Sequence, residues 1–506
     1  MKVYLLYIVL LLAFTIKVNN GNRFPGEIKI SKSELLNKIK GGWAGQTIGV
    51  CYGLPTEFRY RKMMIPDSVK MTLTGEQLKS RFNNDDIYMD AKFIEVIGRL
   101  GIGAQADSFA VAFANAGFRL WHANQAARYN ILNGIMPPES GHWSNSMHSD
   151  DIDFQIEADF GGLTSAGVPC AAVEISDKVG HIMNYGDGWY SGVYIAAMYS
   201  LAFISDDINF IINEALKLIP PKSKFYQAMK DVIKWHGKYP DDWKKTWHEI
   251  EKSEWSYDLH CTAGVYRPFN IDATVNMAYV LIGLLYGDGN FTKSMDISMR
   301  CGQDSDCNPS SVGGILGTLM GYDKIPAKWL NSYKEIENIT LNYTNVSLND
   351  CYEICYNTSV HNIIEYGGKV EGDYITIKYQ KPETLPLEVA YPDIFPNNEI
   401  TVDKPVQDVG KIRFNGTGIA VLGGPSGKDF ENNNYVAEIQ VSIDGKPFAV
   451  RRLPFNYHSR ALEIFFDLEL SKGDHVLELK WINPVNGIDI PVSRCLVFSD
   501  ELVKKN

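Results

Sequence analysis

The stretch Arg300-Cys301-Gly302-Gln303-Asp304-Ser305-Asp306-Cys307-Asn308-Pro309 sets two carboxylates one residue apart. No lysine or arginine occurs between Gln303 and Asp323, so neither acid has a basic neighbour downstream in the sequence. An apolar run precedes the stretch and a glycine-rich segment follows it, which indicates that both acids are partly buried. Carboxylates crowded in this way repel one another unless one is protonated or a cation lies between them.

A second stretch, Asn83-Asn84-Asp85-Asp86, has the same character. The apolar spacing from Ile87 to Ile97 is typical of a helix, and it sets the two acids at the N-terminus of that helix, where the helix dipole favours negative charge. Taken alone, this stretch has a simpler interpretation as a pair of capping acids. We expect that the two acidic stretches, although far apart in the sequence, meet around bound metal.

Glycines at a spacing of four residues mark two predicted helices. Each glycine costs a helix roughly 1 kcal/mol relative to alanine, so something must compensate for so many of them. Close packing of two smooth helix faces is the expected compensation, and it places both helices near the centre of the fold; a glycine-rich loop is the alternative. Ser31 is the expected N-cap of the first helix, with Glu34 three residues later. The glycines are Gly41, Gly45, Gly49 and Gly53 in the first segment and Gly313, Gly317 and Gly321 in the second.

Length and composition allow two or three domains. The chain has 506 residues, is 45% hydrophobic and carries a formal net charge of −11, and it contains no long basic run, which argues against nucleic-acid binding. The apolar run from Val3 to Ile16 after Lys2 predicts a signal peptide over residues 1–22, and hence a secreted or periplasmic protein. This run is short for a membrane span, and no later stretch is long and apolar enough to form a stable one.

Periodicity divides the rest of the chain. Helical patterns, including one helix over residues 108–132, predict an all-α catalytic domain over 28–345. Residues 346–395 are interpreted as a linker and first β segments, and the alternating pattern that follows predicts a small all-β sandwich over 396–503. The β-domain either binds carbohydrate or packs on the helical domain. Eight dispersed cysteines favour buried free thiols, although Cys351 and Cys355 are close enough to pair locally.

These motifs resemble the ADP-ribosylglycohydrolase family over roughly residues 33–330. Gly53-Leu54-Pro55-Thr56-Glu57 is similar to the turn that ends the glycine-rich helix of the family. Asn84-Asp85-Asp86-Ile87 resembles its Thr-Asp-Asp-Thr motif, and the segment from Cys301 to Cys307 resembles its late Gly-Gly-Asp-Thr-Asp-Thr motif. The resemblance implies an all-α bundle with two Mg²⁺ ions at its centre.

The resemblance also implies roles for individual residues. Glu57 matches a position at which some members place a catalytic or gating glutamate, and Asp85 is the second candidate base. His181 resembles the histidine of a Thr-His element, and Asn184, Tyr185 and Asp187 would lie beside the substrate. One or two Mg²⁺ ions are expected, and Mn²⁺ and Ca²⁺ also prefer oxygen ligands. The positions of the metal ligands are those of Asn84, Asp85, Asp86, Asp304, Asp306 and Cys307.

Three departures from the family pattern bear on the substrate. Asn84 replaces a threonine and keeps an oxygen ligand, whereas Cys307 replaces a threonine with a thiol, which is a poor ligand for Mg²⁺. The glycine-rich ribose loop is not recognisable, and the acid-rich segment Asp151–Asp159 stands in its place, with Asp153 and Glu157 as candidates for substrate binding. So many carboxylates would repel a pyrophosphate, so we expect a substrate other than ADP-ribose.

The sequence therefore predicts a secreted, metal-dependent glycoside hydrolase that cleaves an N- or O-glycosidic bond in a small molecule or glycan. An ADP-ribosyl-protein hydrolase is one alternative, and a non-catalytic, metal-stabilised glycan-binding protein is another. No oligomeric state follows from the sequence.

Overall fold

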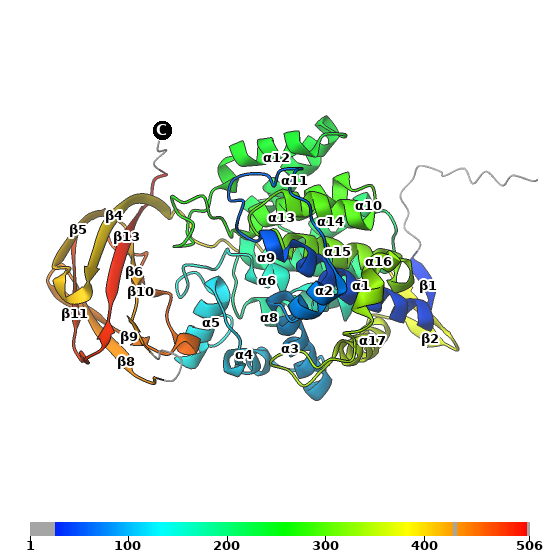
Figure 1. Ribbon diagram of the computed structural model, residues 1–506, viewed down its shortest axis with the longest axis horizontal. Coiled ribbons are helices and arrows are strands. Elements are labelled where there is room, and N and C mark those ends of the chain that lie inside the picture. The colour runs from blue at the N-terminus through cyan, green and yellow to red at the C-terminus, as the bar shows by residue number, and fades with distance from the viewer. Residues whose placement is uncertain (1–25, 429–432, 503–506) are drawn as a thin grey trace, which may run out of the picture.

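The computed structural model describes residues 26–428 and 433–502. A helical domain is followed by a β-sandwich, and the two lie side by side (Figure 1), which confirms the predicted fold class. The predicted signal peptide over residues 1–22 lies outside the described residues. Within the described residues, no helix combines the length and the apolarity needed to cross a membrane.

The helical domain is built from helices of very different lengths. They are α1 (Lys32–Gly53), α2 (Gly75–Arg81), α3 (Asp85–Leu100), α4 (Ala106–Asn115), α5 (His122–Leu132), α6 (Asp153–Ile156), α7 (Asp159–Leu163), α8 (Pro169–Gly180), α9 (Asp187–Ala202), α10 (Ile208–Ala215), α11 (Lys224–Lys238), α12 (Trp243–Lys252), α13 (Ala273–Tyr286), α14 (Phe291–Arg300), α15 (Cys307–Met320), α16 (Ala327–Tyr333) and α17 (Leu348–Glu365).

The prediction of a single helix over residues 108–132 was wrong, because this region forms α4 and α5. The buried guanidinium of Arg128 donates hydrogen bonds to the carbonyl oxygens of Ala116 and Phe118. Those carbonyls therefore accept from a side chain and not from the backbone N–H groups of a continuing helix. The link between the two helices is extended at Ala116.

Helices α1 and α15 contact each other through their backbones at the centre of the domain. A Cβ atom on Gly45 would lie 2.0 Å from the carbonyl oxygen of Gly313, and one on Gly41 would lie 2.1 Å from that of Gly317. The glycine spacing therefore serves close packing, as predicted. The side chain of Ser31 accepts a hydrogen bond from the backbone N–H of Glu34, which confirms the predicted N-cap of α1.

Residues 346–395 differ from the predicted linker and β segments because they begin with a helix. Helix α17 starts at a capping box formed by Ser347 and Asp350, and it packs on α1. The strands that follow, β2 (Lys369–Glu371) and β3 (Tyr374–Lys378), form a sheet in the order β1-β3-β2 with β1 (Glu27–Ser31). This small sheet belongs to the helical domain and ties both of its ends together.

All eight cysteines are free thiols, including Cys351 and Cys355. Both of these lie on the buried face of α17, where the indole N–H of Trp43 donates to the sulfur of Cys355. The default expectation of buried thiols is met for every cysteine except Cys170, which is half-buried.

The β-sandwich consists of two antiparallel sheets in the orders β10-β6-β13-β4 and β5-β11-β8-β9. Alternate residues of β8 are buried, as the alternating sequence pattern predicts, and they pack with residues of the other sheet in one apolar core. The strands are β4 (Phe395–Pro405), β5 (Lys411–Gly416), β6 (Gly418–Gly423), β8 (Val436–Ile443), β9 (Lys446–Pro454), β10 (Glu463–Asp467), β11 (Gly473–Trp481) and β13 (Pro491–Ser499), with a short pair formed by β7 (Ser426–Gly427) and β12 (Ile488–Asp489).

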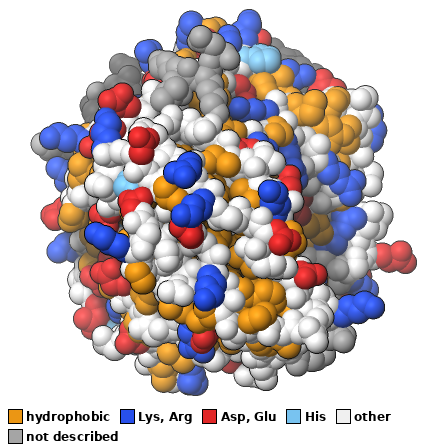
Figure 2. Space-filling model, turned by 90° about the vertical axis from the view of Figure 1, so that its left-hand side faces the viewer, with side chains coloured by type: hydrophobic (Ala, Val, Ile, Leu, Met, Phe, Trp, Pro, Cys, Tyr) orange, Lys and Arg blue, Asp and Glu red, His pale blue; other side chains and the backbone are white. Residues whose placement is uncertain are grey.

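The sandwich packs on the helical domain through an apolar cluster. Met147 and Val265 from helical-domain loops meet Ala420, Leu496 and Phe498 of the β10-β6-β13-β4 sheet there. Packing on the helical domain, one of the two roles considered for the sandwich, is thus what the structure shows. On the face that the sandwich presents in Figure 2, acidic and basic side chains are interspersed with apolar ones, so no continuous basic surface is seen there.

Candidate active site

A pocket of about 550 Å³, within the size range of small-molecule sites, is lined by residues of the helical domain. Residues of both acidic stretches line it, together with residues from the start of α5 and the loop before α13. No lysine or arginine is among its described lining residues, which are Leu54, Glu57, Phe58, Asn83, Asn84, Asp85, Tyr88, Met89, Trp121, His122, Asn124, Ile152, Asp153, Ile156, Phe269, Ile271, Asp304 and Cys307.

The packing of α1 against α15 brings the acids together. Gly53 at the end of α1 lies against the backbone of Ser305, and the hydroxyls of Thr56 and Ser305 are 2.8 Å apart. The 3₁₀ turn η1 (Leu54–Thr56) then presents Glu57 next to the acids that precede α15. Asp85 and Asp86 belong to a further element, the first turn of α3.

Several buried oxygens at this pocket have no hydrogen-bond partner. Asp86 is 1% exposed and Asp304 is 2% exposed. Both carboxylate oxygens of Asp86, Oδ1 of Asp304 and Oδ1 of Asn84 lack a partner at hydrogen-bonding distance and angle. Buried charges without partners are costly, so this set of oxygens fits a divalent cation that accepts hard oxygen ligands.

The pKa values of the acids reflect the same crowding. Burial, and then the charges of Asp85 and Asp306, raise the pKa of Asp86 well above its usual range. Burial and the charges of Glu57 and Asp86 raise the pKa of Asp304 to about 7. A bound cation would reverse both effects by favouring the ionised carboxylates.

Cys307 fits this cation less well than its neighbours do. Its sulfur lies close to the carboxylates of Asp304 and Asp306, and ligand atoms of these three residues all lie within 4.8 Å of one another. The thiol points to Oδ1 of Asp306 at 3.9 Å, as a weak hydrogen-bond donor would. Because thiols are poor ligands of hard cations, the oxygens of this group suit such a cation better than the sulfur does.

Comparison with known proteins places this arrangement in a family. The family model for ADP-ribosylglycohydrolase matches residues 31–353. The chain belongs to the ADP-ribosylglycohydrolase family. No curated protein matches the chain. A solved structure titled "ADP-ribosylglycohydrolase-related protein complex" is similar to it with a TM-score of 0.45 and 13% sequence identity, over 65% of this chain and 99% of that chain.

Membership in the ADP-ribosylglycohydrolase family indicates a hydrolase in general terms. The size of the pocket suits a small molecule. The matched residues end within α17, so the β-sandwich falls outside the match. The sandwich is an addition to the helical fold of the family, held against it by the apolar cluster described above.

Glu57 lies at the rim of the pocket, with part of its side chain exposed. Partial burial of the carboxyl, and then the charges of Asp306 and Asp85, raise the pKa of Glu57 to about 8. A carboxyl with such a pKa keeps its proton at neutral pH and is suited to general acid catalysis.

The two acids predicted to replace the ribose loop of the ADP-ribosylglycohydrolases have mainly local partners. Asp153 lines the pocket, but its carboxylate accepts hydrogen bonds from the backbone N–H groups of Ala123 and Asn124 at the start of α5. Burial raises the pKa of Asp153 to about 7 against these bonds. Glu157 is fully buried, is hydrogen-bonded to Asn124 and does not line the pocket, so its predicted contact with substrate is not seen.

The structure does not bring the other four predicted substrate-binding residues to the pocket. His181 contacts Asp177 and Glu388, and Tyr185 packs against His142. The other two serve the backbone, because Asn184 donates to the carbonyls of Ser149 and Asp151, and Asp187 accepts from the N–H of Phe225. Asn184 instead binds the backbone of the segment that carries Ile152 and Asp153, two lining residues of the pocket.

Aromatic residues of the pocket wall were missed by the sequence interpretation. Phe58 and Phe269 are in contact, with ring centroids 4.8 Å apart, and His122 stacks on Phe269 at 5.4 Å. Trp121, 45% exposed, lies beside them. These residues come from separate loops and follow no periodic pattern, so nothing in the sequence marked them as neighbours.

The setting of His181 predicts how stability depends on pH. Burial opposes protonation, but hydrogen bonds to Asp177 and Glu388 outweigh it and raise the pKa of His181 from 6.5 to about 9. The resulting stabilisation is fully present below about pH 6.5 and is lost as pH rises through about 9. Between these values, the free energy of unfolding of the natural chain should fall by on the order of 2 kcal/mol more than that of His181→Gln in urea titrations. Parallel pH profiles for the two proteins would contradict this.

Proposed function

We propose that this ADP-ribosylglycohydrolase family member is an exported, metal-dependent glycoside hydrolase that cleaves an N- or O-glycosidic bond of an uncharged sugar. The observation that carries the proposal is the set of buried oxygens without partners on Asp86, Asp304 and Asn84, which line or adjoin one pocket. Their chemistry suits one or two Mg²⁺ ions, and Mn²⁺ or Ca²⁺ would find the same ligands. Asn84, Asp85, Asp86, Asp304 and Asp306 would hold the metal.

The residues of the chain divide the reaction between them. When bound, the metal supplies Lewis-acid chemistry, which polarises sugar oxygens. Glu57, whose partial burial favours the protonated form, would donate its proton to the departing oxygen or nitrogen as the glycosidic bond breaks. Asp85, on the same pocket wall, accepts the proton of the water that attacks the anomeric carbon. The proton taken up by Asp85 and the one lost by Glu57 balance over one turnover.

The pocket wall supports an uncharged sugar as the substrate. Trp121 and Phe58 line the pocket with aromatic rings that suit the apolar face of a sugar ring. The lining contains Glu57, Asp85, Asp153 and Asp304 without a lysine or arginine among its described residues, which disfavours a diphosphate. An ADP-ribosyl-protein hydrolase is the second candidate, supported by the family match. A non-catalytic glycan-binding protein is the third, because Cys307 leaves the ligand set short of oxygens.

A direct comparison of substrates tests the proposal. Full-length protein is incubated with a panel of glycans and with ADP-ribosylated protein, each with Mg²⁺ and after treatment with EDTA. We expect sugar release from at least one glycan, loss of that activity in EDTA and recovery on adding Mg²⁺. Release of ADP-ribose alone would favour the second candidate. Glycan cleavage that survives EDTA would contradict the role of the metal, and binding of a glycan without turnover would favour the third candidate.

A further inference from the structure

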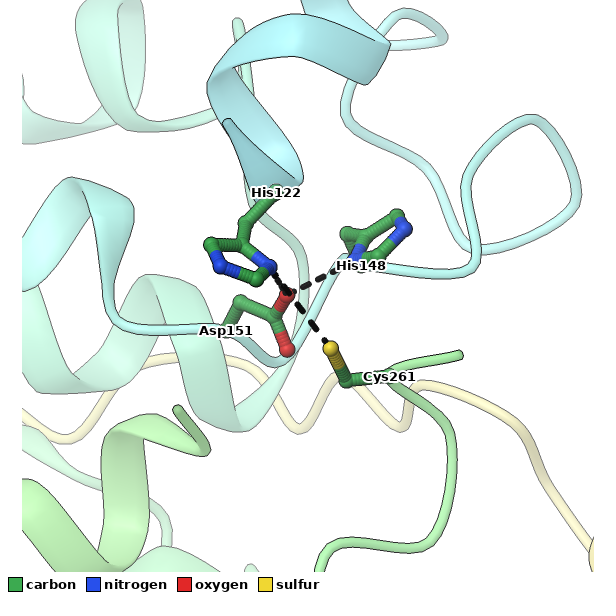
Figure 3. A group of neighbouring side chains, drawn as sticks. All are labelled: His122, His148, Asp151 and Cys261. Carbon is green, nitrogen blue, oxygen red and sulfur yellow. Dashed lines mark hydrogen bonds and ion pairs between the residues drawn. The ribbon is translucent and has the colours of Figure 1, made fainter. Parts of the chain in front are cut away.

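Four side chains next to the pocket form a second cluster, which the proposed hydrolysis does not use. They are His122 at the start of α5, His148 and Asp151 in the loop before α6, and Cys261 in the loop before α13. Figure 3 shows the four pointing toward one another from these separate segments. One ligand atom from each lies within 4.8 Å of the other three.

Two of three distances within the cluster match the edges of a small coordination polyhedron, and the third has the shorter length of a hydrogen bond. Nδ1 of His148 is 2.8 Å and Nδ1 of His122 is 3.5 Å from Oδ2 of Asp151, and Sγ of Cys261 is 3.7 Å from Nδ1 of His122. A tetrahedron with metal–ligand bonds of about 2.0–2.3 Å has edges of about 3.3–3.8 Å. Small side-chain adjustments would therefore place a metal ion within bonding distance of all four ligand atoms.

Burial and an oxygen without a hydrogen-bond partner favour a cation at this cluster. His148, Asp151 and Cys261 are 2%, 1% and 0% exposed. Oδ1 of Asp151 and Oδ2 of the neighbouring Asp258 are both buried, and neither accepts a hydrogen bond. A buried carboxylate oxygen without a partner is costly, and a cation within the cluster would compensate for it.

The geometry differs from that of a catalytic cysteine. In a nucleophilic triad, the histidine contacts the nucleophile through one ring nitrogen and the orienting carboxylate through the other. Here Nδ1 of His122 faces both Cys261 and Asp151. Several donors that converge from different sides on one point are typical of a shared ion.

The surroundings of His148 suit a metal-bound histidine. Its Nδ1 faces the cluster, and its Nε2 lies 3.0 Å from Oε1 of Glu463, the first residue of β10. The hydroxyl of Thr262 donates to the same oxygen at 2.7 Å. A carboxylate on the outer nitrogen fixes the tautomer and the ring orientation of a metal-ligating histidine.

We propose that His122, His148, Asp151 and Cys261 bind one borderline-soft divalent transition-metal ion, with Zn²⁺ as the natural candidate. Two imidazoles, one thiolate and one carboxylate are ligands that Zn²⁺ accepts and Mg²⁺ does not favour, so this site is chemically distinct from the oxygen site of the pocket. Four protein ligands leave no open position, which is typical of a structural zinc site. Cys261 binds as the thiolate, and its proton passes to the solvent.

Such an ion would join the two domains beside the pocket. The ligands belong to the helical domain, and Glu463 of the sandwich holds His148 from the other side. His122 also lines the pocket, so the ion would fix one wall of it. The proposal stands on the cluster alone and does not depend on what the pocket hydrolyses.

Metal analysis and cobalt spectroscopy on the full chain test the site. The protein is stripped of metal and reloaded with Zn²⁺ or Co²⁺, and bound metal is quantified after gel filtration. We expect about one equivalent of Zn²⁺ per chain and, for Co²⁺, the near-ultraviolet charge-transfer band of a thiolate ligand. Cys261→Ser should lose this band and weaken the Kd for Zn²⁺ at least about 100-fold, and His122→Gln should weaken it by a smaller factor.

Two controls separate this site from the rest of the protein. Cys170→Ser, at a half-buried thiol on α8, should keep both the zinc and the band. Asp304→Asn should also keep them, since it removes a ligand only from the oxygen site. Folded natural protein, judged by circular dichroism, that binds neither Zn²⁺ nor Co²⁺ would overturn the proposal. A cobalt band that persists in Cys261→Ser would overturn it too, and if that variant does not fold, His122→Gln and the natural protein decide the outcome.

Discussion

Asp304→Asn is expected to lower kcat/KM by about 10³-fold on whichever glycan the substrate panel identifies. The substitution keeps the shape of the side chain but removes a negative charge from a group whose Oδ1 is buried without a partner. Because several acids share the site, one lost charge weakens metal binding and misplaces the polarised oxygen of the sugar. The measurement is steady-state hydrolysis with saturating Mg²⁺.

Asp107→Asn is the matched control, because Asp107 lies exposed in the first turn of α4, away from the pocket. It should leave kcat/KM within about twofold, as surface substitutions usually do. Unfolding curves test whether both variants are folded, and removal of a repulsive buried charge should raise the Tm of Asp304→Asn in EDTA. Full activity in a folded Asp304→Asn would contradict the assignment of this carboxylate to the metal.

Gly45→Ala is expected to lower the free energy of unfolding by about 3 kcal/mol. The added Cβ would lie 2.0 Å from the carbonyl oxygen of Gly313, which is far inside contact distance. Both atoms belong to central helices, so relief requires α1 and α15 to move apart, and the pocket acids held at their ends would move with them. Urea unfolding followed by circular dichroism gives the change in stability.

Gly237→Ala is the matched control within a helix. Gly237 lies in α11, and nothing is within 4 Å of the position that its Cβ would take. Alanine should stabilise the protein there by up to about 1 kcal/mol, because it favours the helix over the unfolded chain. Equal effects of the two substitutions would show that backbone contact between α1 and α15 does not decide the stability of the domain.

The centre of the fold could be predicted because the residues that determine it form short patterns in the sequence. Glycines at every fourth position are costly unless two helices meet, and Gly45 and Gly313 do meet. Unpaired acids such as Asp86 and Asp304 are costly unless they share a cation, and they do adjoin one pocket. In both cases a local cost in the sequence pointed to a distant partner.

Features that depend on loop conformation could not be predicted in this way. His122, His148 and Cys261 lie far apart in the chain, and no metal-binding spacing links them. The family resemblance placed Asn184 beside the substrate, yet its amide binds the backbone of the loop at Ser149. Helix α17 was missed because its apolar face is interrupted by polar residues, whereas its capping box at Ser347 and Asp350 was readable.

Binding of Mn²⁺, followed by electron paramagnetic resonance of the free ion, tests the central claim most directly. The natural chain, Asp86→Asn and Asp304→Asn are each titrated with Mn²⁺, with Asp107→Asn as the control. If the two acidic stretches form one site, both ligand variants lose the same binding event, with a Kd weakened by at least about 10-fold, and Mg²⁺ competes for it in the natural chain. If Asp86→Asn and Asp304→Asn bind Mn²⁺ as tightly as the natural chain does, or if only one of them is weakened, the two stretches do not share a metal.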